Sequence, residues 1–325
     1  MATYLVTGGA GFIGSHLCRS LAERGERVRA LDDLSSGRLG NLEGVLDRVE
    51  FIRGDVRDGE VLKGAMQGVD FVLHEAAVAS VARSLEEPLE VDRINVEGTL
   101  QVLCAARDTG VRRVVFAGSA AAYGDDPTLP KREDMPPKPL SPYAASKLAG
   151  EHYCRAFWEV YGLETVVLRY FNVFGPGQDL GSPYSGVISI FLGRLFKGEE
   201  LVVFGDGEQM RDFVFIEDVV RATLSACEAP GVAGEVFNVG RGEGVTINKL
   251  AEVVIEVTGL EGKVRHSPPR PGDVRASVAD ITRAREQLGY RPEVSLREGL
   301  IRTARWFRGG IWRRGLGYSW TGTAL

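Results

Sequence analysis

The chain has 325 residues, of which 44% are hydrophobic and 26% charged, a composition typical of a globular protein with room for more than one domain. The formal net charge is −5 and the sequence has no basic block, so we expect no nucleic-acid-binding surface. No apolar run reaches membrane-spanning length, and a strand-like segment beginning at Thr3 leaves no room for a cleavable targeting peptide. The four scattered cysteines and four histidines lack metal-ligand spacing, which predicts reduced thiols, a cytoplasmic location and no metal site.

A β-prone run from Thr3 to Thr7 leads into a glycine-rich turn and then into a helical pattern that continues to about Glu23. The glycines of the turn are Gly8, Gly11 and Gly14. Strand, glycine turn and helix in this order are typical of a dinucleotide-binding fold, because glycine lets the backbone approach a pyrophosphate and the helix N-terminus faces its charge. Taken alone, a glycine triplet also fits an ordinary tight turn.

The second predicted strand, Arg27 to Leu31, ends at the acidic pair Asp32 and Asp33. An acid at this position accepts hydrogen bonds from the adenosine ribose and repels a 2′-phosphate, which favours NAD over NADP. The alternative is a solvated acid at a strand end.

Strands and helices continue to alternate after residue 48, which predicts a parallel sheet with helices on both faces and a ligand at the carboxyl ends of its strands. Asp55 and Val56 follow one strand and are expected at the adenine edge, and the small Ala76 and Ala77 follow another and leave room for a cofactor. Ser119 also follows a strand, where a routine turn serine is the alternative. The expected elements are strands over Val49 to Arg53, Phe71 to His74, Arg113 to Ala117 and Glu164 to Arg169, and a long helix over about Pro88 to Thr109.

Six prolines between Pro127 and Pro142 predict an extended loop that leads to a helix beginning at Ser141 and Pro142. Tyr143 and Lys147 are four residues apart and therefore share one face of this helix. An ammonium beside a phenol lowers the pKa of the phenol, so Tyr143 is predicted to act as a general base near neutral pH. An ordinary surface helix would carry the same spacing.

Together these motifs identify a family resemblance that extends to about residue 305. The segments Thr7 to Ser15, Asp32, Ser119 to Gly124 and Tyr143-x-x-x-Lys147 resemble, in order and spacing, the extended short-chain dehydrogenases/reductases of the nucleotide-sugar epimerase/dehydratase group. The resemblance implies an α/β fold, with a doubly wound parallel Rossmann sheet and a smaller mixed α/β substrate-binding lobe. It implies an NAD-binding domain over residues 1–172 and a UDP-sugar-binding lobe over 173–325, with chain crossings between the two.

The resemblance also assigns site residues. The catalytic group is Ser119, Tyr143 and Lys147. The implied NAD contacts are Gly8, Gly11, Phe12, Ile13, Gly14, Asp32, Asp33, Ser36, Gly37, Asp55, Val56, Ala76, Ala77, Asn95, Tyr143, Lys147 and Tyr170. The implied substrate contacts are Ser119, Ala121, Tyr143, Asn172, Val187, Ile188, Val203, Arg211, Arg270, Asp273 and Ser277, with Arg211 and Arg270 on the diphosphate and Asp273 near the uridine ribose.

Within the group, the chain looks most like UDP-glucose and UDP-N-acetylglucosamine 4-epimerases. Related dehydratases and decarboxylases carry acids directly after the active hydroxyl residue, whereas this chain has Ala120 and Ala121, which cannot move protons. Ser277 replaces the bulky aromatic of strict UDP-galactose epimerases and leaves volume for an N-acetyl group. The resemblance thus implies exchange of glucose with galactose, and of the N-acetylated pair, by transient hydride transfer to bound NAD and rotation of a 4-keto intermediate.

Three alternatives stay open at this point: a UDP-glucuronate 4-epimerase, an NAD-linked nucleotide-sugar reductase and, more remotely, a non-catalytic NAD-sensing scaffold. Two departures from the family pattern are visible, since Ala121 lacks a usual sugar contact and Glu75 replaces an apolar residue without an evident reason. Relatives pair through helices near residues 92–108 and 143–161, so a homodimer is expected. The tail after about Gly309 has no clear period.

Overall fold

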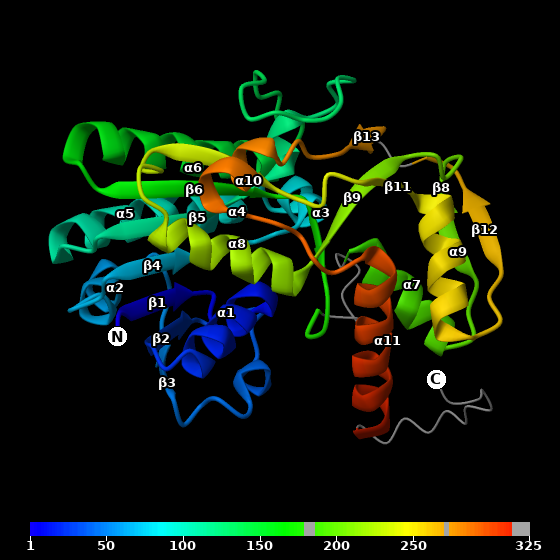
Figure 1. Ribbon diagram of the computed structural model, residues 1–325, viewed down its shortest axis with the longest axis horizontal. Coiled ribbons are helices and arrows are strands. Elements are labelled where there is room, and N and C mark those ends of the chain that lie inside the picture. Colours follow the sequence, from blue (N-terminus) through cyan, green and yellow to red (C-terminus); the bar gives the residue numbers. More distant parts are fainter. Residues whose placement is uncertain (179–185, 270–272, 314–325) are drawn as a thin grey trace.

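The fold is built on one large parallel sheet beside a smaller lobe (Figure 1). The computed structural model of the chain describes residues 1–178, 186–269 and 273–313. In the large sheet the strand order is β10-β6-β5-β4-β1-β2-β3, and every neighbouring pair is parallel. The bounds of its strands are β1 (Thr3–Thr7), β2 (Arg27–Asp32), β3 (Val49–Arg53), β4 (Phe71–His74), β5 (Arg113–Ser119), β6 (Glu164–Tyr170) and β10 (Glu235–Val239).

Helices cover both faces of this sheet. On one face α1 packs against α8, and on the other α5 packs against α2 and α6 (Figure 1). Alternate residues of a strand point to opposite faces, so Tyr4 and Val6 of β1 join one hydrophobic core while Leu5 joins the other. These helices are α1 (Phe12–Glu23), α2 (Gly59–Ala65), α5 (Gly98–Thr109), α6 (Pro142–Tyr161) and α8 (Ile216–Glu228). The predicted α/β fold with a doubly wound parallel sheet is confirmed.

The long helix predicted over Pro88 to Thr109 is interrupted. The structure has α4 (Pro88–Asp92), a π-helical turn over Arg93–Glu97 and then α5, with the short α3 (Val81–Glu86) before them. In the turn, the Asn95 amide accepts a hydrogen bond from Val78 N (2.8 Å) and donates to Ser146 Oγ (3.0 Å). The widened turn places Asn95 between the loop after β4 and α6. The spacing of apolar residues along the helix does not predict this contact.

The smaller lobe comes from the second half of the chain. Its main sheet has the order β11-β9-β13, with β7 also paired to β9, and a separate pair joins β12 to β8. The chain returns to the large sheet in between, because β10 adds the seventh strand beside β6. The elements of the lobe are β7 (Asn172–Phe174), α7 (Val187–Phe196), β8 (Leu201–Phe204), β9 (Met210–Phe215), β11 (Gly244–Thr246), α9 (Ile247–Thr258), β12 (Val264–Ser267), β13 (Ala276–Ser277), α10 (Thr282–Leu288) and α11 (Leu296–Arg313).

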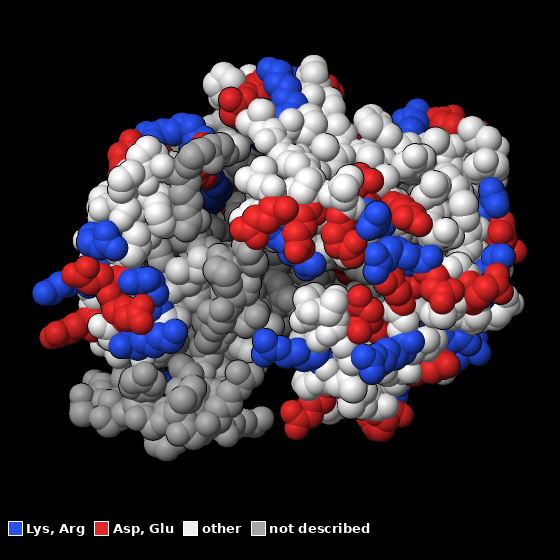
Figure 2. Space-filling model, turned by 180° about the vertical axis from the view of Figure 1, so that it is seen from behind, with Lys and Arg blue, Asp and Glu red and all other residues white. Residues whose placement is uncertain are grey.

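The surface carries both signs of charge. On the face drawn in Figure 2, Lys and Arg side chains are interspersed with Asp and Glu over the described residues. Among the helices of the described part, none combines the length and the apolar character that a membrane span requires.

Candidate active site

The predicted site residues meet at the carboxyl ends of neighbouring strands. Thr7 at the end of β1 pairs in register with His74 at the end of β4, and Ser119 at the end of β5 pairs with Tyr170 at the end of β6. Because these strands are parallel and adjacent, the loops that leave them open on one edge of the sheet.

The glycine turn after β1 is shaped for close backbone approach. Gly8 has a φ of +65°, and a Cβ on it would lie 2.8 Å from Ala76 N. A Cβ on Gly14 would lie 2.8 Å from the carbonyl carbon of Gly8 and 2.9 Å from Gly9 Cα. The turn therefore leaves a cradle that only glycine preserves, in front of the N-terminus of α1, and this fits the pyrophosphate of a dinucleotide.

Asp32 is fixed at the end of β2 beside this turn. Its carboxylate is buried and accepts hydrogen bonds from Ala10 N (3.0 Å) and Leu34 N (2.8 Å). Burial raises the pKa of Asp32, and these two backbone bonds oppose the rise. A Cβ on Gly37 would lie 2.7 Å from the same carboxylate. The Asp33 carboxylate closes a local turn by accepting hydrogen bonds from Ser35 N (2.8 Å) and Ser35 Oγ (2.6 Å).

Helix α6, which carries Tyr143 and Lys147, begins as the sequence predicts. Ser141 Oγ accepts a hydrogen bond from Ala144 N (3.1 Å), and Pro142 occupies the first turn. The Ser119 hydroxyl at the end of β5 acts on the Tyr143 phenol of α6 and favours its ionised form, so the two side chains face the same part of the site. Lys147, one turn further along α6, donates from its ammonium to Ala117 O (2.9 Å) and lies over the Phe116 ring.

The low pKa predicted for the Tyr143 phenol is not found in the structure. Burial raises the pKa of Tyr143, and the bond from Ser119 is the interaction that opposes the rise. The physical reason is the direction of the Lys147 ammonium, which reaches the Ala117 carbonyl and interacts electrostatically with Glu75. Spacing along a helix places two side chains on one face, and it does not decide which partner a long side chain selects.

A sequence model of the NAD dependent epimerase/dehydratase family matches residues 4–240. The chain belongs to this family. The match contains the glycine turn, Asp32 and the helix of Tyr143 and Lys147, and NAD is accordingly its cofactor.

Relatives and solved structures agree with the family. A UDP-glucose 4-epimerase of Mycolicibacterium smegmatis is 42% identical over 309 residues, covering 94% of this chain and 98% of the relative. The crystal structure of a UDP-glucose 4-epimerase from Thermotoga maritima with UDP-glucose superposes with a TM-score of 0.91 at 42% identity, covering 95% and 99% of the two chains. A UDP-N-acetylglucosamine 4-epimerase from Methanobrevibacter ruminantium, in complex with UDP-N-acetylmuramic acid, has a TM-score of 0.91 at 38% identity, with the same coverage.

The predicted substrate residues of the smaller lobe lie on adjoining strands. Ser277 of β13 pairs in register with Arg211 of β9, and Asn172 of β7 pairs with Phe213 of the same strand. Arg211 forms an ion pair with Asp273. Burial lowers the pKa of the Arg211 guanidinium, and Asp273 opposes this.

For the other predicted substrate residues, the structure shows packing or backbone roles, or does not describe the residue. Val203 and Ile188 are buried in the hydrophobic core, so their side chains support the lobe, whereas Val187 at the start of α7 is only partly buried. Arg270 lies outside the described residues. Ala121 follows Ser119 in a short 3₁₀ turn, where its N–H donates to Ser119 Oγ (3.2 Å).

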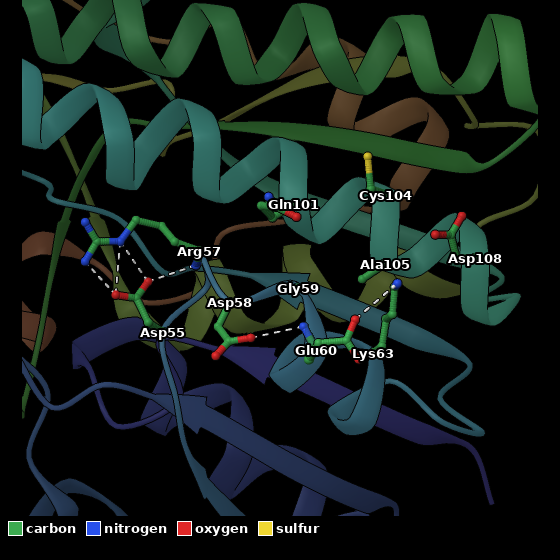
Figure 3. Close-up of a pocket in the computed structure, with 10 residues that line it drawn as sticks. All are labelled: Asp55, Arg57, Asp58, Gly59, Glu60, Lys63, Gln101, Cys104, Ala105 and Asp108. Atoms are coloured by element: carbon green, nitrogen blue, oxygen red, sulfur yellow. Dashed lines mark hydrogen bonds and ion pairs between the residues drawn. The ribbon is translucent and has the colours of Figure 1, made fainter.

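A cleft of about 670 Å³ opens elsewhere, between α2 and α5 (Figure 3). Within it Asp55 and Arg57 form an ion pair, and Asp55 is the one lining residue that the sequence assigns to the cofactor. Ser119, Tyr143 and Lys147 are not part of its lining, so the cleft borders the expected adenine end and is separate from the catalytic group. The residues that line it are Asp55, Arg57, Asp58, Gly59, Glu60, Lys63, Gln101, Cys104, Ala105 and Asp108.

The buried His74 and the carboxylate of Glu75 had no role assigned to them from the sequence. His74 is buried between Thr7 Oγ1 (2.7 Å) and Thr99 Oγ1 (3.0 Å), and burial lowers its pKa to about 3. Glu75 accepts a hydrogen bond from the Tyr170 hydroxyl (2.9 Å), which also meets Thr223. The acid next to a strand end was visible in the sequence, but its partners lie far along the chain and gave no local signal.

Proposed function

We propose that the protein is a UDP-hexose 4-epimerase, which exchanges UDP-glucose with UDP-galactose and the corresponding N-acetylated pair. The observation that carries this proposal is that Ser119 and the Ala117 carbonyl bound by Lys147 lie at the end of β5, where Ser119 also acts on the Tyr143 phenol, on the sheet edge that holds the glycine turn. Ala120 and Ala121 follow Ser119, so the segment directly after the active hydroxyl supplies no acid for loss of water or carbon dioxide.

NAD held by the glycine turn and Asp32 would supply a reversible hydride acceptor for the sugar C4. Tyr143 takes the proton of the C4 hydroxyl and gives it back, while the Ser119 hydroxyl orients that oxygen. Lys147 holds the cofactor side of the site and contributes a positive charge to it. Since burial raises the pKa of Tyr143, ionisation of the phenol depends on the Ser119 bond and on positive charge brought in with the ligands.

The diphosphate anchors the substrate while the sugar turns. Arg211 lies in the smaller lobe beside Ser277 and has a guanidinium suited to phosphate oxygens. Its present partner, Asp273, would then be free to face the uridine ribose. An anchored nucleotide keeps the oxidised sugar in the site, which makes a second substrate unnecessary.

Acceptance of N-acetylated sugars is assigned to Ser277. A serine here leaves room that a tyrosine would fill, and its register with Arg211 keeps it close to the expected diphosphate site. The test compares kcat/KM for UDP-glucose and UDP-N-acetylglucosamine in the wild type and Ser277→Tyr. We expect selective loss of the acetylated substrate; equal losses of both activities would refute the pocket.

The activity itself is tested without added NAD. Purified protein is incubated separately with UDP-glucose, UDP-N-acetylglucosamine and UDP-glucuronate, and the products are separated by chromatography. The proposal expects the C4 epimers of the first two and no net reduction of NAD. Conversion of UDP-glucuronate alone, or net change in NADH absorbance, would replace it with the glucuronate epimerase or with the reductase.

Tyr143→Phe tests whether the Tyr143 hydroxyl carries out the proton transfer. This variant keeps the ring and removes the hydroxyl that moves the proton, so turnover should fall by at least ~10²-fold. NAD content and thermal stability should stay close to those of the wild type. Full activity of the variant would remove Tyr143 from the proton transfer.

We further propose a homodimer through α6 and through α5 with the turn before it, the helices near residues 143–161 and 92–108. Tyr153, Val160 and Tyr161 of α6 are 37%, 70% and 53% exposed, which is more large apolar surface than one helix usually leaves to solvent. Light scattering should give twice the monomer mass, and Tyr153→Glu with Val160→Glu should reduce it.

A further inference from the structure

Glu75 is the polar residue of the active-site edge that the proposed reaction does not use. It follows β4 directly, and its backbone N–H donates to Thr7 O (3.2 Å) at the end of β1. Its carboxylate accepts a hydrogen bond from the Tyr170 hydroxyl at the end of β6 (2.9 Å). Glu75 therefore lies between the end of β1, where the glycine turn begins, and the end of β6, the strand that pairs with β5 and Ser119.

The hydrogen bonds around Glu75 are complete with the carboxyl in either protonation state. Tyr170 Oη is 2.8 Å from Thr223 Oγ1, and Thr223 donates to Val219 O (2.9 Å). With Glu75 ionised, the Tyr170 hydroxyl donates to the carboxylate. With Glu75 protonated, the carboxyl donates a hydrogen bond to the Tyr170 hydroxyl, Tyr170 donates to Thr223, and Thr223 donates to Val219 O. No buried donor is left unpaired in either case, so the chain tolerates a change of charge on Glu75.

The groups around Glu75 leave one charged partner for it. Burial lowers the pKa of His74, and burial raises the pKa values of Tyr170, Cys154 and Cys227, so all four are neutral near pH 7. Lys147 is the exception. His74 pairs in register with Phe116, which sets Glu75 opposite Ala117, and the Lys147 ammonium donates to the Ala117 carbonyl (2.9 Å). Burial lowers the pKa of this ammonium and raises the pKa of the Glu75 carboxyl, and the attraction between the two charges opposes both shifts.

Lys147 has no other carboxylate to hold its charge among the described residues that act on it. Its hydrogen-bond acceptor is the Ala117 carbonyl, and the Phe116 ring, the neutral His74 imidazole and the neutral thiol of Cys154 also lie near it. An ammonium in such surroundings loses its proton readily unless an opposite charge is near.

We propose that Glu75 is a positioning residue, whose carboxylate, held by the Tyr170 hydroxyl, keeps Lys147 charged in a buried site. This inference rests on the proposed function, because the proposed reaction requires a positive charge on Lys147. Loss of the carboxylate removes the attraction, so Lys147 should release its proton at lower pH. The alkaline limb of the pH profile should then move toward neutrality by about one pH unit or more.

The test measures kcat/KM against pH for the wild type, Glu75→Gln, Glu75→Leu and Glu75→Asp. The two neutral variants should show the shifted limb, and Glu75→Asp should restore it at least in part. Glu75→Leu is included in case Glu75→Gln does not fold. In Glu75→Leu the Tyr170 hydroxyl can donate to Thr223, so no buried donor is left unpaired. The matched control is Glu133→Gln, which removes another partly buried carboxyl with a raised pKa, bonded to Asn238 N (2.8 Å), and should leave the limb in place.

A second readout does not depend on activity. The ε-carbon of Lys147 is titrated by NMR in protein labelled with ¹³C-lysine, with the signal assigned through Lys147→Arg. We expect the Lys147 signal to titrate at lower pH in Glu75→Gln than in the wild type. An unchanged titration or an unchanged alkaline limb would overturn the role of Glu75. A wild type inactive on every UDP-sugar, with the NMR shift present, would overturn the proposed function alone.

Discussion

Gly14→Ala should separate cofactor binding from folding. In the structure a Cβ on Gly14 would lie 2.8 Å from the carbonyl carbon of Gly8 and 2.9 Å from Gly9 Cα, whereas ordinary contacts begin at 3.4 Å. Both neighbours are backbone atoms of the turn, and the Gly8 carbonyl also accepts the hydrogen bond from Gly11 N (3.0 Å). The turn must therefore move by about half an ångström or more, and overpacking of this kind costs about 1–3 kcal/mol.

Because the same backbone is expected to face the pyrophosphate, most of this cost should appear in NAD binding. We expect NAD affinity to fall by about 10-fold or more, since about 1.4 kcal/mol corresponds to one factor of ten. The assay is calorimetry on protein stripped of NAD, with thermal unfolding in parallel. Gly64→Ala is the control, because Gly64 lies in α2 with no atom within 4 Å of an added Cβ, and alanine is the better helix former. Unaltered NAD binding by Gly14→Ala would refute the assignment of the turn.

Other predictions concern stability. Glu151→Ala leaves the buried Arg169 guanidinium without its carboxylate, to which it donates bonds of 3.0 and 2.5 Å. The free energy of unfolding, measured with a denaturant, should fall by about 3–5 kcal/mol. The control Glu159→Ala removes an exposed carboxylate of the same helix and should lower it by less than about 1 kcal/mol. Equal costs would show that the buried pair does not anchor α6. The pKa of His74 is lowered in the fold from 6.5 to about 3, so its neutral form stabilises the protein above pH 6.5 and this contribution is lost as the pH falls toward 3, by up to about 1.4 kcal/mol per pH unit. Melting temperatures of the wild type should therefore drop more steeply over that range than those of His74→Gln, and parallel slopes would contradict the neutral buried imidazole.

The sequence predicts the large sheet well because its strands are short, buried and separated by turn residues. The predicted limits of β1, β3 and β4 coincide with the structure, since glycine or acidic residues mark where each strand ends. The place of β10 in the same sheet was not predicted, because a strand from the second half joins through pairing with β6 and not through any local pattern. The break of the helix at Asn95 has the same origin, as its partners Val78 and Ser146 lie elsewhere in the chain.

For the predicted catalytic group, the structure changes the expected electrostatics. Tyr143 and Ser119 were expected to converge, and the Ser119 hydroxyl does act on the phenol. The predicted lowering of the phenol pKa by Lys147 is wrong in the structure, because burial dominates at Tyr143 and the ammonium turns to Ala117 O and interacts with Glu75. Burial and side-chain direction depend on packing between distant segments, which residue spacing does not contain.

The central claim is that one hydrogen leaves the sugar C4 as hydride and returns to the same carbon on the opposite face. It is tested most directly with UDP-glucose that carries deuterium at C4, incubated with the purified protein, and with mass spectrometry and NMR of the UDP-galactose formed. Retention of deuterium at C4 is the predicted result. Loss of the label to water, or its transfer to added NAD, would contradict the account.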